Sequence, residues 1–448
     1  MHRYDEDTNE LARAVLAYAT ERVAMDPPPL DHPRTAAELE ADAGQTITEE
    51  GLGGHEALRV FAEVLAPATI SVDHPRYLSF IPGAPSEAAV LFDLVVGASS
   101  IYGGSWYEGA GAVFAENQAL RWLADLAGLP PESGGVFVQG GTNGNLSALV
   151  AARHAAAERR GGRPERWRVA VADSVHSSVR SSAAVMDVDV LVVPTPDQRL
   201  TGDGLATALD RHGADDVFAV VASAGSTNLG IVDDLAGIAG VAAERGLWLH
   251  VDGAYGAAAL AAPSARALFD GIERCDSFTV DPHKWLFAPF DCCALLYRDP
   301  LQARRAHAQK AEYLDSLQAL RNWDPSDFAV HLTRRARGLP FWFSLATHGT
   351  RAYSDAIEQT LAVARGAAAE IAGREELELI REPDLSVVAL RRRGWAAADY
   401  EAWSAKLLAD QVGFVVPTSV DGEPATRIAI VNPRTTLDDI RIILDSLR

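Results

Sequence analysis

The chain has 448 residues, of which 48% are hydrophobic and 23% charged, and its formal net charge is −21. This length and composition predict a globular protein of two or three domains and exclude a disordered chain. The acidic balance, with no compensating Lys/Arg cluster, argues against nucleic acid or an anionic membrane surface as a partner.

Cysteine usage and the first residues indicate the compartment. The three cysteines, Cys275, Cys292 and Cys293, cannot form a disulfide framework, which favours a reducing cytoplasm. Residues 1–7 are acidic and lack the basic and apolar regions of a signal peptide. No uncharged apolar stretch is long enough to span a bilayer. We therefore expect a cytoplasmic protein, and we identify no metal ligands.

Residues 1–72 are predicted to form an N-terminal helical segment. Apolar residues recur at helical spacing in two groups, Leu11, Val15 and Tyr18, and then Leu58, Phe61 and Leu65. Prolines at 27–29 and 67 end these helices. Because two helices cannot bury a core alone, this segment must pack on the rest of the chain or on a second copy, which favours a homodimer.

Residues 73–345 alternate short valine-rich runs with helix-length segments. The pattern predicts an α/β domain with a mostly parallel sheet and helices on both faces. The expected strands are residues 167–172, 188–193, 217–222, 247–251, 277–280 and 294–297. In such sheets ligands bind beyond the carboxyl ends of the strands.

Residues 346–448 are predicted to form a small C-terminal α+β domain that closes over the site, with a helix near 361–372 and strands at 385–390 and 427–431.

Three polar turns in the α/β region have features of a ligand site. Residues 139–145 form a Gly-rich turn before an alanine-rich helix, whose N-terminal N–H groups suit a phosphate. Taken alone, such a turn is as often a tight connection. His176 follows a strand and is suited to stacking on a ring, although beside a capping serine an incidental histidine is the simpler interpretation. Thr227 follows another strand and, alone, is more often part of a turn.

Asp252 and Lys284 both follow predicted strands and together suit pyridoxal 5′-phosphate. An amine forms a Schiff base with the aldehyde of this cofactor, and a carboxylate holds a proton on the pyridine nitrogen, which makes the ring an electron sink. The alternatives are a surface lysine and a helix-capping aspartate. An acid at the end of an apolar run is costly unless paired, and Lys284 is flanked by bulky residues, so we favour the cofactor interpretation.

Four segments together resemble the group II pyridoxal-phosphate-dependent amino-acid decarboxylases, which include the aromatic-L-amino-acid and glutamate decarboxylases. They are residues 74–77 (HPRY), 173–178 (DSVHSS), 250–255 (HVDGAY) and 281–285 (DPHKW). The resemblance extends from about residue 70 to 345, and a weaker resemblance is found at residues 427–433. It implies a fold type I (aspartate aminotransferase-like) homodimer with active sites at the subunit interface. It also implies decarboxylation of an L-amino acid to the amine and CO2.

The resemblance also assigns roles by motif. Lys284 would form the Schiff base, Asp252 would pair with the pyridinium nitrogen, and His176 would stack over the ring. The other residues near the cofactor would be Ala254 under the ring, Thr227 beside it, and Gly141, Thr142, Asn143 and His283 at the phosphate. The residues expected near the substrate are Tyr77, Pro82 and Trp106, which would shape the pocket, and Arg427, which matches an arginine that meets the substrate carboxylate in glutamate enzymes.

Phe328 marks a departure from the family pattern. These decarboxylases usually place a tyrosine on a mobile loop after the lysine, as the proton donor, and the best match here is Phe328 in a shorter loop. With phenylalanine there, either His176 or a water that it orients protonates the substrate carbon, or oxygen reacts and an aldehyde forms, as in the aldehyde synthases of the family. Because His176 is retained, we favour the amine.

The substrate and the enzyme class each have alternatives. Pro82 and its neighbours resemble the aromatic enzymes more than the glutamate enzymes, which favours an aromatic L-amino acid, with acidic and aliphatic substrates still open. An aminotransferase or a cysteine-desulfurase-like lyase would share Asp252 and Lys284, but the His176 motif and His283 weigh against both. A cofactor-binding regulator joined to a DNA-binding domain is disfavoured because residues 1–72 contain no basic recognition helix.

Overall fold

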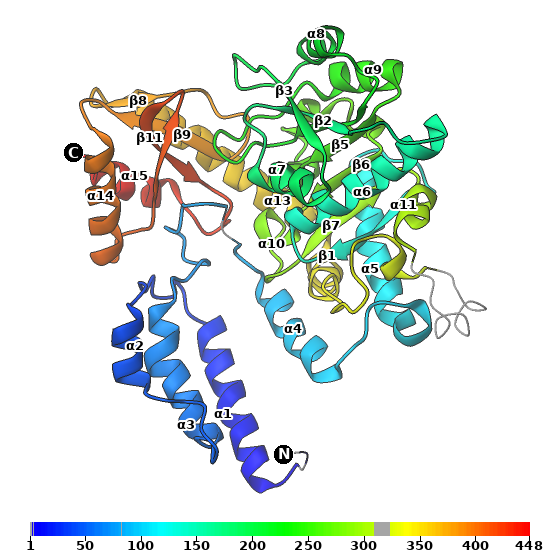
Figure 1. The fold of residues 1–448 in the computed structure, drawn as a ribbon. Coiled ribbons are helices and arrows are strands. Elements are labelled where there is room, and N and C mark those ends of the chain that lie inside the picture. The colour runs from blue at the N-terminus through cyan, green and yellow to red at the C-terminus, as the bar shows by residue number, and fades with distance from the viewer. Residues whose placement is uncertain (1, 3, 82, 309–322) are drawn as a thin grey trace.

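The computed structural model describes residues 2, 4–81, 83–308 and 323–448 (Figure 1). Its central element is a seven-stranded sheet with the order β1-β7-β6-β5-β4-β2-β3. β7 pairs antiparallel with β1 and β6, and the other pairs are parallel. The strands are β1 (Gly134–Val138), β2 (Arg168–Ala172), β3 (Asp189–Val193), β4 (Val217–Ser223), β5 (Trp248–Asp252), β6 (Ser277–Val280) and β7 (Cys293–Tyr297). The predicted mostly parallel sheet is confirmed.

Helices cover both faces of this sheet (Figure 1). The α-helices are α5 (Trp106–Leu126), α6 (Gly141–Arg160), α7 (Ser177–Val185), α8 (Gly202–His212), α9 (Leu235–Arg245), α10 (Pro282–Trp285) and α11 (Pro300–His307). Short helices of other types are η3 (Gly256–Ala261), η4 (Arg266–Phe269), η5 (Ile272–Arg274) and η7 (Pro325–Asp327). The buried alanines of α6 pack in one core, and the apolar residues of α9 pack in the other.

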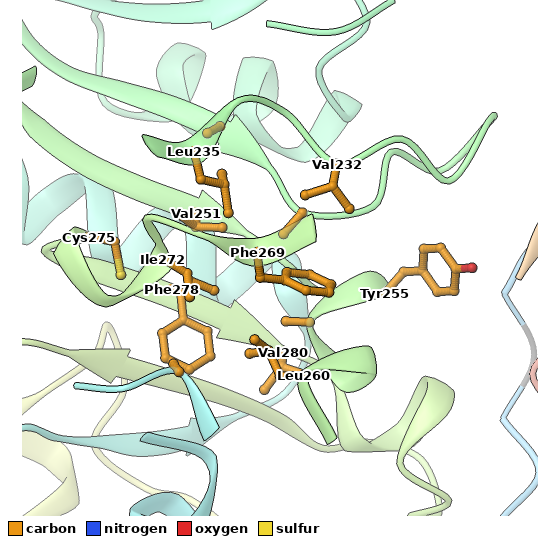
Figure 2. Packing of buried hydrophobic residues seen from close by; sticks show 14 of the residues in the cluster. Val232, Leu235, Val251, Tyr255, Leu260, Phe269, Ile272, Cys275, Phe278 and Val280 are labelled. Carbon is orange, nitrogen blue, oxygen red and sulfur yellow. The ribbon is translucent and has the colours of Figure 1, made fainter. Parts of the chain in front are cut away.

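The alternation of side chains along β5 determines which residues face the site. Val251 packs with Phe278 and Phe269 in the core on the α9 side (Figure 2). Trp248 belongs to the other core, on the α6 side. Since side chains along a strand alternate between faces, His250 and Asp252 lie on the α6 side with Trp248. Gly144 lets α6 approach the sheet there, because a Cβ on Gly144 would lie 2.6 Å from Thr279 Cγ2.

The N-terminal segment projects from the body of the chain (Figure 1). Its elements are α1 (Glu6–Val23), α2 (Ala36–Ala43), α3 (Gly54–Val60), the π-helix η1 (Phe61–Leu65) and η2 (Ala66–Ala68), followed by α4 (Glu87–Ser99). No residue of α1 or α2 is buried. An ion pair of 2.8 Å between Arg22 and Asp73 ties α1 to the segment that leads into the body. The helical segment therefore contributes little to a core within one chain.

The C-terminal part has its own antiparallel sheet, with the order β10-β11-β9-β8. Its elements are α13 (Leu339–Ala372), β8 (Leu377–Leu379), β9 (Val387–Arg392), α14 (Ala397–Ala409), β10 (Pro417–Val420), β11 (Glu423–Ala429) and α15 (Leu437–Asp445). The backbone of α13 is non-helical at Gly349, where φ is 77°, and the division expected at residue 345 falls inside this helix shortly before that kink. Within the described ranges, no helix is both long and apolar enough to cross a membrane.

Candidate active site

A cavity of about 320 Å³ lies beyond the carboxyl ends of the central strands. Eight predicted site residues line it: Gly141, Thr142, His176, Thr227, Asp252, Ala254, His283 and Lys284. They come from five connections, after β1, β2, β4, β5 and β6, which the sheet brings to one edge. The sheet thus assembles in one cavity a lysine, an aspartate, two histidines and a helix N-terminus.

Lys284, in the short helix α10, is held by a carboxylate within its own turn. Its Nζ lies 2.8 Å from Oδ2 of Asp281, a residue that is 1% exposed. Burial opposes the ammonium charge, but the Asp281 carboxylate outweighs this effect, and the pKa of Lys284 is raised. Burial likewise opposes the carboxylate charge, yet Lys284 and His283 lower the pKa of Asp281. The two groups therefore form an ion pair in the cavity.

The backbone of Cys292 orients His283. Nδ1 of the ring lies 2.7 Å from the Cys292 carbonyl oxygen and 3.0 Å from its amide nitrogen, and Nε2 is 3.6 Å from Asp281 Oδ2. Burial lowers the pKa of His283, although Asp281 opposes that effect. The ring is therefore positioned before any ligand arrives.

Two donors stabilise the Asp252 carboxylate. Asn145 Nδ2 donates to Oδ2 at 2.9 Å, and the Ala254 N–H donates to Oδ1 at 3.1 Å. Nearby, the exposed His176 caps α7 and has its Nδ1 2.8 Å from the Ser178 hydroxyl. The arrangement leaves Nε2 of His176 free of these local contacts.

The Gly-rich turn that is predicted to bind the cofactor phosphate lies at the N-terminus of α6. A Cβ on Gly141 would lie 3.0 Å from Ala254 Cβ and 3.3 Å from Asp281 Oδ2, so only glycine fits there without displacing its neighbours. Oδ1 of Asp281 is buried without a hydrogen-bond partner in the described chain. Asn143 does not line the cavity, because its N–H donates to Gly140 O at 3.0 Å and its Oδ1 accepts from Ser147 at 3.3 Å.

Three residues expected near the substrate are outside the lining of this cavity in the single chain. Tyr77 is buried, with its ring 5.0 Å from that of Phe414, and the N–H of Trp106 donates to Asp324 at 2.7 Å. Arg427 is buried and donates to the Phe80 carbonyl oxygen at 2.8 Å. A fourth residue, Pro82, lies outside the described residues.

The structure places Phe328 in a core and not in the lining of the cavity. Its side chain is 4% exposed, stacks on Trp323 with ring centroids 4.3 Å apart, and belongs to the core on the α6 side. Its carbonyl oxygen also accepts from the buried Tyr297 hydroxyl at 3.0 Å. A ring enclosed by its own core does not reach a substrate, so Phe328 is a packing residue. The preceding residues 309–322, which include Tyr313, lie outside the described chain.

The polar residues of the cavity lining that sequence reasoning missed include Asn145, Ser178, Tyr255 and Asp281. Each of these residues belongs to one of the motifs described in the sequence, so its position in that motif could have identified it. Tyr255 is the least expected, because its hydroxyl lies 2.6 Å from Ser386 Oγ in the C-terminal part. Burial raises the pKa of Tyr255, so its phenol stays neutral and hydrogen-bonded.

Comparison with known proteins decides the family. Residues 47–393 match the model of the pyridoxal-dependent decarboxylase conserved domain. The chain belongs to this family. It is 29% identical over 419 residues to an aromatic-L-amino-acid decarboxylase of Bacillus atrophaeus, covering 90% of this chain and 87% of that protein. It is 32% identical over 418 residues to an L-2,4-diaminobutyrate decarboxylase of Rhizobium meliloti, covering 90% and 83%.

A solved relative agrees in fold and cofactor. The structure of Oryza sativa TDC with PLP and tryptamine superposes with a TM-score of 0.90 at 26% identity, covering 100% of this chain and 99% of that one. The lysine, the aspartate and the glycine-lined helix N-terminus of the cavity fit pyridoxal phosphate chemically. The protein is accordingly a fold type I, pyridoxal-phosphate-dependent amino-acid decarboxylase, that is, a carboxy-lyase.

Proposed function

We propose that this decarboxylase converts an aromatic L-amino acid to its amine and CO2, with Lys284 as the amine that binds the cofactor. When bound, pyridoxal phosphate supplies an electron sink for cleavage of the bond to the carboxylate. Asp252 would hold the proton of the ring nitrogen, and His176 would lie over the ring. The N–H groups at the start of α6 and His283 would bind the phosphate. Asp281 is the counter-ion that holds Lys284 in place, at 2.8 Å.

The observation that best supports an aromatic substrate is that each aspartate of the cavity lining already has a hydrogen-bond or ion-pair partner in the protein. Of the three aspartates in its lining, Asp252 accepts from Asn145, Asp281 pairs with Lys284, and Asp291 pairs with Arg337. The cavity wall thus offers no unpaired carboxylate, among the residues described, for a second substrate ammonium group. Phe290, in contrast, lines the cavity and is 56% exposed as a residue, which suits contact with an apolar side chain.

L-2,4-Diaminobutyrate is the second candidate, because the relative with that activity is 32% identical over most of both chains. Its side-chain ammonium would need a carboxylate, and Asp291 is the cavity aspartate closest to solvent, with a side chain 42% exposed. Binding of that substrate would require Asp291 to leave Arg337. The variant Asp291→Asn separates the candidates, since it would abolish use of diaminobutyrate and leave use of an aromatic substrate largely intact.

The deciding experiment measures CO2 release from a panel of L-amino acids. The panel contains tryptophan, tyrosine, phenylalanine, 3,4-dihydroxyphenylalanine, histidine, glutamate and 2,4-diaminobutyrate, with Lys284→Ala as the inactive control. We expect kcat/KM for one aromatic substrate to exceed that for diaminobutyrate and glutamate by about 100-fold or more, because unmatched charges are poorly accepted in a site built for apolar groups. A preference for diaminobutyrate would overturn the aromatic assignment.

We propose the amine, and not an aldehyde, as the product. The argument for an aldehyde depended on Phe328 replacing a loop tyrosine, and the ring of Phe328 is instead enclosed in the core. His176, which lines the cavity, is available to orient a proton donor. Assay of amine, ammonia and peroxide after incubation with substrate distinguishes the products. Stoichiometric peroxide and ammonia would contradict this part of the proposal.

We also propose a cytoplasmic homodimer with the units 1–72, 73–345 and 346–448. α1 and α2 bury no residue within the chain, and Leu91, Leu94 and Val95 of the neighbouring α4 are exposed. Apolar helix faces of this kind are characteristic of an interface, and a second copy of the chain is the partner that the family resemblance implies. Three free cysteines, all buried, suit a reducing compartment.

A further inference from the structure

Behind Asp252 lies a buried polar network whose centre is Asn145. Both the nitrogen and the oxygen of the Asn145 side-chain amide form hydrogen bonds. Nδ2 donates to Asp252 Oδ2 at 2.9 Å and to Ser178 Oγ at 3.0 Å, while Oδ1 lies 2.9 Å from His250 Nε2. Asn145 is 1% exposed and His250 is fully buried. A buried amide that satisfies two partners on β5 and one on α7 is a strong constraint on both elements.

The direction of every hydrogen bond in this network follows from its two ends. At one end, Trp248 Nε1 can only donate, and it gives its proton to Ser277 Oγ at 2.8 Å. The Ser277 hydroxyl then donates to His250 Nδ1 at 2.9 Å, which leaves the His250 proton on Nε2, facing Asn145 Oδ1. At the other end the Asp252 carboxylate accepts only. The reverse orientation of the Asn145 amide would place two acceptor oxygens 2.9 Å apart.

The same chain reaches the second side of the cavity through Ser178. Because Ser178 Oγ accepts from Asn145, its own proton is directed to His176 Nδ1, 2.8 Å away. The Ser178 N–H also points to this Nδ1, at 3.2 Å. His176 consequently carries its proton on Nε2 when neutral. One asparagine therefore orients Asp252 directly and, through the Ser178 hydroxyl, supports the tautomer of His176 that the Ser178 N–H also favours.

We propose that Asn145 is a positioning residue that keeps Asp252 aimed at the cofactor ring nitrogen and that, through the Ser178 hydroxyl, supports the tautomer of His176. This rests on the proposed roles of Asp252 and His176. Removal of the amide takes one of two donors from a nearly buried carboxylate and leaves the His250 Nε2–H without its acceptor. Asp252 then holds the ring proton less firmly. Burial lowers the pKa of His250 to about 4, so this ring stays neutral and donates only through Nε2 at working pH.

The test compares Asn145→Leu, and Asn145→Ser as a smaller replacement, with the matched control Asn432→Ala. Asn432 is also a buried asparagine that uses both ends of its amide, but it binds Asp73 O and the Arg434 N–H and does not line the cavity. Each protein is loaded with pyridoxal phosphate labelled with ¹⁵N in the ring, and the ¹⁵N shift and kcat are measured against pH.

We expect both Asn145 variants to shift the ring ¹⁵N signal toward the unprotonated form and to lower kcat by about 10- to 100-fold with little change in KM, as for loss of a hydrogen bond to a buried charge. Ser178→Ala should lower kcat less and leave the ¹⁵N shift unchanged, because it breaks only the branch to His176. Asn432→Ala should match the wild type in both. A wild-type ¹⁵N shift and pH profile in both folded Asn145 variants would overturn the inference.

Two further variants distinguish failure of this inference from failure of the proposed function. Asp252→Asn and Lys284→Ala are measured in parallel. If Asp252→Asn abolishes the protonated ¹⁵N signal while the Asn145 variants retain it, the inference alone fails. If Asp252→Asn and Lys284→Ala both keep wild-type spectra and activity, the assignment of the active site itself is wrong.

Discussion

Lys284 Nζ and Asp281 Oδ2 lie 2.8 Å apart in the wall of the cavity, within one turn of α10. The pair gives the lysine a carboxylate partner beside the place where it must react as a neutral amine. Burial opposes the lysine charge, but Asp281 outweighs this and raises the pKa of Lys284. On the proposed role of Lys284 as the cofactor-binding amine, Asp281 would restrain Schiff-base formation while it orients the amine.

Asp281→Asn should accelerate cofactor uptake near neutral pH. Loss of the carboxylate lowers the pKa of Lys284, and each unit of lowering raises the neutral fraction about tenfold. The rate of pyridoxal phosphate uptake, followed by absorbance between pH 6 and 10, should shift its profile to lower pH. Asp291→Asn is the control, because that cavity carboxylate pairs with Arg337. An unshifted profile in Asp281→Asn would show that the ion pair does not govern the amine.

Arg427→Met should weaken substrate binding. No aspartate or glutamate of the described chain pairs with this buried guanidinium, which donates to the Phe80 carbonyl oxygen. If it receives the substrate carboxylate, its removal should raise KM about 30-fold or more, the effect of truncating a buried charge partner. Arg427→Lys should be intermediate, because lysine keeps the charge but not the planar fork. Unchanged KM in steady-state kinetics of Arg427→Met would remove Arg427 from the substrate site.

His307→Gln should reduce the loss of stability in acid. Burial lowers the pKa of His307 to about 4, and its Nε2 lies 3.0 Å from the Ser147 carbonyl oxygen. An unfolded histidine binds a proton near pH 6.5 and the folded one only near 4, so its contribution is present above pH 6.5 and is lost as the pH falls through this interval. Urea unfolding at pH 7.5 and 5 should show a smaller difference in unfolding free energy for His307→Gln than for the wild type. The exposed His348→Gln should behave like the wild type, and an equal difference in all three proteins would refute the assignment.

Leu94→Glu combined with Val95→Glu should disrupt the proposed homodimer. These side chains are exposed on α4, and a pair of charges on an apolar interface should raise the dimer dissociation constant about tenfold or more. Sedimentation velocity over a concentration series measures it. The exposed Val185→Glu of α7 is the control for added charge at a position away from α4. A wild type that sediments as a monomer at all concentrations would contradict the dimer.

Much of the architecture was predictable because it depends on local pattern. The valine-rich runs identified the strand that ends at Asp252 and the strand that precedes Lys284, and strand order placed both residues at one edge of the sheet. The relay through Asn145 and His250 was not foreseen, because it joins residues more than a hundred positions apart, although the shared face of Trp248, His250 and Asp252 was readable from their spacing of two.

The core position of Phe328 has a tertiary cause. Its position before Arg334 and Arg335 suggested a catalytic loop, whereas its environment is set by stacking on Trp323 and by the core against α6. Nothing in the neighbouring residues distinguishes a phenylalanine that lines a pocket from one that fills a core. Spatial partners make that distinction, and these become visible only in the fold.

The most direct test of the central claim is to locate the cofactor-binding lysine chemically. The chain contains only three lysines, Lys284, Lys310 and Lys406, so borohydride reduction of the loaded enzyme followed by peptide mass mapping gives an unambiguous result. The account predicts a phosphopyridoxyl group on Lys284 and no CO2 release by Lys284→Ala. A group on Lys310 or Lys406, or full activity of Lys284→Ala, would contradict it.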